Sequence, residues 1–144
     1  MREIIESVRQ GGDSALIALT QHFDGVTPSP LRVDAEAMIA ALDRLEPDLR
    51  RSLYQAADRI RAYHEAQFPT DVLVEHPGLS IRGIHRAVER AACYVPGGRA
   101  VYPSTVLMTA VPAAVAGVDE VVICVPPGPK GIVPDVVLAA AALA

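Results

Sequence analysis

Cysteine is scarce in this sequence, because only Cys93 and Cys124 occur among its 144 residues. The two positions are far apart, and each lies inside an apolar stretch. This pattern predicts two buried free thiols of a reducing compartment rather than a disulfide or a cysteine-based metal site.

Basic residues are also few: the chain has 13 Lys and Arg against 17 Asp and Glu, and it contains no run of basic residues. A chain with a net charge of -4 lacks the positive field that nucleic-acid binding needs, so we expect no nucleic-acid partner. No apolar run is long enough to span a bilayer without Pro or charge, and the opening REIIESVRQ is charged and amphipathic. We therefore expect no membrane partner, no signal peptide and a cytoplasmic location.

Hydrophobic residues make up 51% of the chain, enough for one ordinary core. Residues 1–67 carry apolar side chains at helical spacing, interrupted by Gly11 and Gly12. Asp13 and Asp34 are placed to cap the helices that follow them, and Pro47 suits the first turn of a longer helix. These residues predict an amphipathic helical layer.

The pattern changes to a period of two over residues 72–86, where a His-Pro-Gly turn separates two short runs and predicts a β-hairpin. Beyond it, apolar runs at 91–95 and 120–125 flank a helical segment, Ser104 to Ala116, that ends at Gly117. Such runs predict two parallel strands buried on both faces and joined by a crossover helix. A further helix is expected from about Pro134 to Ala144.

The fold class expected from these patterns is α/β, with a helical layer, a hairpin and the start of an incomplete Rossmann-like parallel βαβ domain. We divide the chain into an N-terminal helical segment (1–67), a connecting hairpin (68–90) and a first βαβ unit (91–144). A parallel sheet needs more strands and helices to cover it, so we expect the chain to be part of a larger protein.

The stretch YVPGGRAVYPST, residues 94–105, lies where open parallel sheets bind ligands, beyond the carboxyl end of a strand. Gly97 and Gly98 allow close approach of the backbone to a ligand, and Ser104 and Thr105 place hydroxyls and free N–H groups at a helix start. This arrangement suits an anion such as pyrophosphate. The alternative is structural: the glycines only turn the chain, and Ser104 caps the helix.

The amino-acid sequence of this region closely resembles the corresponding stretch of the histidinol dehydrogenase family. The long match over 94–127 is specific, and the resemblance covers nearly the whole chain through shorter matches at 8–16, 22–24, 63–67 and 85–90. The sequence departs from the family at Ala87, where proline is usual, and at Ala91, Ala92 and Cys93, where a Val-Gly-Leu-like run is usual.

The resemblance implies a homodimeric, zinc- and NAD-dependent dehydrogenase that oxidises L-histidinol through histidinal to L-histidine with two NAD molecules. It implies that Tyr94 contacts NAD, and we assign Tyr94, Pro96, Gly97, Gly98 and Ser104 to the cofactor site. The zinc ligands and the catalytic residues of the family are expected outside these 144 residues, so we assign no catalytic or metal-binding residue here.

The histidines agree with that assignment, since His22, His64, His76 and His85 show no zinc-binding spacing. His64 and Glu65 are adjacent on a predicted helix and point about 100° apart, which favours a solvated helix end over an acid–base pair. Two other functions remain open. One is a non-catalytic dinucleotide-binding or interaction module, and the other is a relative that oxidises another small alcohol.

Overall fold

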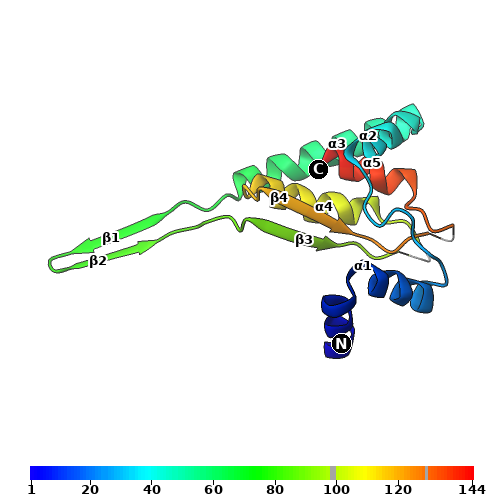
Figure 1. Cartoon of the computed structure of the whole chain (residues 1–144). Helices are drawn as coiled ribbons and strands as arrows, with labels where there is room; N and C mark the ends of the chain where they lie inside the picture. Colours follow the sequence, from blue (N-terminus) through cyan, green and yellow to red (C-terminus); the bar gives the residue numbers. More distant parts are fainter. Residues whose placement is uncertain (98–99, 129) are drawn as a thin grey trace.

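The computed structural model describes residues 1–97, 100–128 and 130–144, which form five helices and two small sheets (Figure 1). In chain order the elements are α1 (Arg2–Asp24), α2 (Ala35–Arg44), α3 (Pro47–Ala66), β1 (Val72–His76), β2 (Leu79–Gly83), β3 (Arg90–Tyr94), α4 (Pro103–Val115), β4 (Glu120–Cys124) and α5 (Asp135–Leu143). The α/β class and the order of helices, hairpin and βαβ unit predicted from the sequence are confirmed. Within the described residues, no helix combines the length and the hydropathy that crossing a membrane requires.

One core joins the helical layer to the βαβ unit. Leu42 of α2 and Leu53 of α3 pack with buried residues of α4 and α5 and with the residue after β3. The buried members of this cluster from the second half are Val95, Val106, Leu107, Val111, Val137, Ala139 and Ala140. No buried residue within the described ranges is polar or charged. The division into segments 1–67, 68–90 and 91–144 stays a prediction.

Short-range signals shape the helices of the first half. Asp34 and Pro47 stand where they were expected, as the N-cap residue of α2 and as the first residue of α3, although Asp34 makes no side-chain capping hydrogen bond. Gly12 has φ 55° and ψ -138°, a conformation that favours glycine, and it bends α1 into two helical segments. No residue of α1 is buried.

The two strands β3 and β4 pair in parallel, with Tyr94 beside Cys124 and Cys93 beside Ile123. The prediction that both faces of these strands are buried is wrong for the described residues. Neighbouring side chains point to opposite faces, and α4 contacts the strands from the face that carries Cys93, which is buried. Cys124 lies on the other face and is exposed, so the prediction of two buried thiols is correct only for Cys93.

The predicted hairpin is confirmed: β1 and β2 pair antiparallel around a turn in which Gly78 adopts φ 78°. Figure 1 shows this hairpin as a narrow arm that extends away from the helices and from β3 and β4. Every residue of its two strands is exposed. The arm returns to the body of the molecule at β3, so its base lies beside the ends of α3 and α4.

Candidate functional site

The carboxyl end of β3 carries an exposed aromatic ring on a fixed backbone. Tyr94 is 70% exposed, whereas the next residue, Val95, has no exposed surface and belongs to the core. The Val95 N–H donates a 2.8 Å hydrogen bond to the Cys124 carbonyl and extends the parallel ladder past the last strand residue. Because Val95 is fixed in the core, the Tyr94 side chain is held on the uncovered face of the strand pair.

The loop after β3 packs closely on the loop after β4. A Cβ atom added to Gly97 would lie 3.3 Å from Pro126 Cδ and 3.4 Å from the Pro126 carbonyl oxygen. A side chain at Gly97 would therefore displace Pro126, which gives this glycine a structural reason besides the predicted approach to a ligand. The neighbouring Gly98, also assigned to the cofactor site, lies outside the described residues.

The first turn of α4 differs in part from the sequence-based prediction. The helix begins at Pro103 with Tyr102 as the N-cap residue, so Ser104 is inside the helix and does not cap it. The N–H groups of Thr105 and Val106 both donate to the Tyr102 carbonyl, at 3.2 and 3.4 Å. The sequence predicted free N–H groups at Ser104 and Thr105, but only the Ser104 N–H has no hydrogen-bond partner among the described residues. Pro103 before it has no N–H to offer.

We use the name strand-end site for the four described residues that the sequence assigned to the cofactor site: Tyr94, Pro96, Gly97 and Ser104. Tyr94, Pro96 and Ser104 are exposed there, and Gly97 is half-buried. They offer an aromatic ring, a hydroxyl group and a backbone donor, but neither an imidazole nor a carboxylate. Such a set can bind the flat ring and the phosphate of a ligand.

An ion pair fixes the opposite end of the strand pair. Arg90 Nε and Nη2 donate to the two carboxylate oxygens of Glu120 at 2.7 and 2.6 Å. The hydrogen bonds and the opposite charge raise the pKa of Arg90 and lower the pKa of Glu120. The two residues are register partners, so the ion pair helps to align β3 with β4 and thereby positions Tyr94 beside Cys124.

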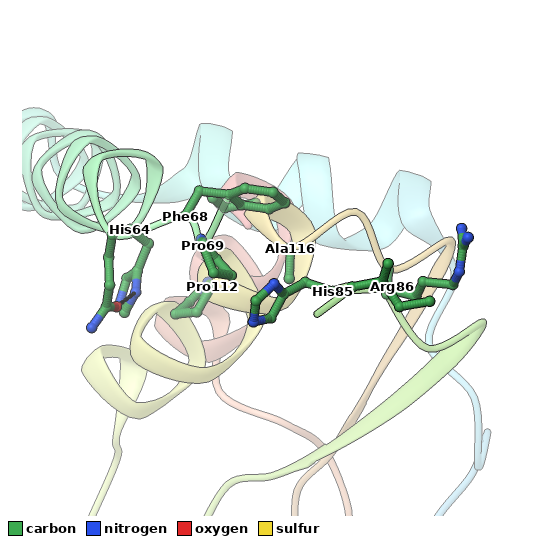
Figure 2. Close-up of a pocket in the computed structure, with 11 residues that line it drawn as sticks. His64, Phe68, Pro69, His85, Arg86, Pro112 and Ala116 are labelled. Carbon is green, nitrogen blue, oxygen red and sulfur yellow. Dashed lines mark hydrogen bonds between the residues drawn. The ribbon is translucent and has the colours of Figure 1, made fainter. Parts of the chain in front are cut away.

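A cavity lies at the base of the hairpin. An open cavity of about 610 Å³ is bounded by the ends of α3 and α4 and by the two chain segments that enter and leave the hairpin. Figure 2 shows His64, Phe68, His85 and Pro112 around it. His64 and His85 are 21 positions apart and show no zinc-binding spacing, yet closing the predicted hairpin necessarily brings the segments on either side of it together.

Two polar groups beside this cavity have local hydrogen-bond partners: the His64 ring and the His85 backbone N–H. His64 Nδ1 lies 2.9 Å from Gln67 Oε1 within the same helix end. His85 Nδ1 is 4.0 Å from Asp71 Oδ1, too far for a hydrogen bond, although the His85 backbone N–H donates to the same oxygen at 3.1 Å. Among the described residues, no three His, Cys, Asp or Glu side chains gather closely enough to hold a metal ion.

Comparison with known proteins agrees with the resemblance seen in the sequence. The family model described as histidinol dehydrogenase matches residues 1–144. The chain is 47% identical over 143 residues to histidinol dehydrogenase of Methanothermobacter thermautotrophicus, covering 99% of this chain and 34% of that protein. It is 49% identical over 142 residues to the enzyme of Parasynechococcus marenigrum, covering 98% and 32%.

A solved structure extends the comparison to the fold. The crystal structure of histidinol dehydrogenase from Elizabethkingia anophelis matches with a TM-score of 0.87 at 30% identity, over 96% of this chain and 32% of that one. The chain thus spans about a third of the length of the relatives that it matches. From the full-length family match, the close curated relatives and the shared fold, we conclude that this chain belongs to the histidinol dehydrogenase family.

Proposed function

We propose that this chain is the N-terminal third of an enzyme that oxidises L-histidinol through L-histidinal to L-histidine with NAD. The observation that carries the proposal is the exposed Tyr94 at the carboxyl end of a parallel strand, in a chain whose family consists of oxidoreductases. Conversion of a primary alcohol to a carboxylate removes two hydrides, so each substrate molecule reduces two NAD molecules.

The strand-end site is the part of the NAD site that this chain contributes. Tyr94 and Pro96 present exposed apolar surface to a flat ring, and the Ser104 hydroxyl and N–H can donate to a phosphate oxygen. Gly97 and Gly98 keep the loop free of side chains where the ligand approaches. NAD supplies the hydride acceptor when bound, whereas the residues of this chain bind and orient it.

The remaining parts of the reaction belong to the rest of the enzyme. The strand-end site holds neither an imidazole nor a carboxylate, and the resemblance to the family places the general base outside this chain. The zinc ligands are expected there as well. We further propose a homodimeric, cytoplasmic enzyme, in keeping with the biosynthetic role of its family.

The test uses the full-length enzyme and the substitution Tyr94→Ala. Loss of one aromatic contact and one hydrogen bond is expected to cost about 1–3 kcal/mol of NAD binding, which corresponds to a roughly ten- to hundredfold higher dissociation constant. Calorimetric titration of NAD measures this constant, and histidinol-dependent formation of NADH measures turnover. The zinc content of the variant should equal that of the wild type.

Tyr54→Ala provides a matched control, because Tyr54 is another exposed tyrosine and lies on α3, away from the strand-end site. It should leave NAD affinity unchanged. If Tyr94→Ala lowers the melting temperature but leaves the NAD dissociation constant of the folded enzyme where it was, Tyr94 is a packing residue and the proposed cofactor site is wrong.

A further inference from the structure

The hairpin arm has two chemically different faces. In the antiparallel register, Val72, Val74, Leu79 and Ile81 lie on one face, together with Gly83 and with His76 at its end near the turn, and we call this the apolar hairpin face. Glu75, Ser80 and Arg82 lie on the opposite face, together with Leu73. A two-stranded sheet with this alternation is built to be covered on one side and to face water on the other.

Nothing in the described residues covers the apolar hairpin face. All four of its apolar side chains are exposed, and the arm extends away from the other elements in Figure 1. A two-stranded hairpin by itself is only marginally stable in water, and it becomes stable when its apolar face packs on another element. The full protein should therefore supply a surface for this face.

The size of the face helps to identify that surface. Two five-residue strands cover about 17 Å by 10 Å, or roughly 170 Å², using a rise of about 3.3 Å per residue and strands about 5 Å apart. A stable contact between two proteins needs about 800 Å² from each partner. The face is thus too small to hold a second copy by itself, whereas a segment of the same chain needs no such area, because it is always present at high local concentration.

The relatives contain enough chain to supply such a segment, since this chain spans only about a third of their length. We propose that the apolar hairpin face is a docking surface for the segment that follows residue 144 in the full-length enzyme. The inference rests on the proposed function in that it takes this chain as the N-terminal third of that enzyme. The arm then ties the first third of the chain to the remainder.

Ile81 and Leu73 provide a matched pair for testing this, because both are 55% exposed and they lie on opposite faces of the hairpin. A photoreactive benzoylphenylalanine is placed at one position or the other in the full-length enzyme. At Ile81 it should form a cross-link within one subunit, to a peptide beyond residue 144. At Leu73 it should give little cross-linked product.

Substitution by lysine gives a second, independent readout. Ile81→Lys should lower the melting temperature of the full-length enzyme by about 3 °C or more, since a buried ammonium group is costly, while Leu73→Lys should change it little. A cross-link from Ile81 at the mass of a dimer, or to residues 1–144, would overturn the proposal. So would equal behaviour of the two positions in both experiments.

The two proposals fail separately. If the enzyme does not oxidise histidinol but Ile81 still cross-links within the subunit, the docking surface stands and the proposed activity is wrong. If histidinol oxidation is observed and Ile81 behaves like Leu73, the activity stands and the docking surface is wrong.

Discussion

Arg90 and Glu120 show how single residues align the strand-end site from a distance. They bind each other at the first positions of β3 and β4, four residues before Tyr94 and Cys124 along each strand. Both side chains are partly exposed, so water and salt screen the ion pair and its contribution to stability is modest. Its main effect is on register rather than on total stability.

The lowered pKa of Glu120 predicts how the stability of the protein changes as the pH falls. A carboxyl group that ionises more easily in the folded state stabilises it above the ordinary pKa of 4.5, and this stabilisation is lost as pH falls through the lowered folded-state pKa. Glu120→Gln removes the titrating group. The melting temperature of the full-length variant should therefore fall less than that of the wild type between about pH 6 and about pH 3.

Asp135 serves as the internal comparison, because its pKa is lowered by Arg44 in the same direction and it is present in both proteins. Only the difference between wild type and variant reports on Glu120. Parallel pH profiles for the two proteins would contradict the link between this ion pair and acid stability.

The positions of the site residues could be predicted from the sequence only in part. Tyr94 follows an apolar run and precedes a Pro-Gly-Gly turn, which places it at a strand end. The exposure of Cys124 was not predictable, because a run of apolar residues does not reveal which face another element covers. The same holds for Gly97, whose contact with Pro126 joins two loops that are far apart in the sequence.

At the scale of helices and strands, residues that end a helix or form a turn could be predicted correctly from their immediate sequence neighbours. Gly117 was expected to end the crossover helix, and it does so with φ 82°, directly after Ala116, the C-cap residue of α4. The Gly117 and Val118 N–H groups donate to the carbonyls of Ala114 and Ala113, which is the hydrogen-bond pattern of a helix ending on a left-handed glycine. The bend of α1 at Gly12 and the turn of the hairpin at Gly78 follow from the same property of glycine.

Gly117→Ala should therefore destabilise the enzyme by about 1–2 kcal/mol, since an L-residue is strained in the left-handed conformation. The added Cβ would lie 3.8 Å from Ala87 Cβ, an ordinary contact, so the cost is conformational and not steric. Thermal melting of the full-length protein measures the effect.

Gly117→Asn is the control for this substitution, because asparagine tolerates the left-handed conformation better than alanine does. Its melting temperature should fall less than that of Gly117→Ala. Equal losses in the two variants would mean that the conformation at Gly117 carries no special cost.

On the scale of the whole molecule, this third of the enzyme leaves much apolar surface uncovered. The apolar hairpin face is exposed, as are Tyr94 and Cys124 on the uncovered face of β3 and β4 and the α1 residues Ile5, Leu16 and Phe23. Such patches favour association between chains. The sequence predicted that the strand pair needs further strands and helices to cover it, but it did not predict that the hairpin would stand apart, because coverage of the hairpin depends on segments far away in the chain.

The isolated 144-residue chain is accordingly expected to self-associate or to pack loosely. Sedimentation velocity over a range of concentrations should show species larger than the 15.3 kDa monomer. A single monomeric species with a sharp, cooperative melt would contradict this expectation, because it would mean that the exposed faces need no cover.

The contact between α2 and α5 has a consequence for synthesis on the ribosome. Arg44 of α2 donates two hydrogen bonds, of 2.8 and 2.7 Å, to the carboxylate of Asp135 in α5, which lies 91 positions later in the chain. At about 5–20 residues per second, α2 waits roughly 5–20 s for the helix that covers its buried side chains. During that interval the side chain of Leu42 lacks the α5 residues that cover it in the folded chain. We therefore expect chaperones to bind the nascent chain at this stage.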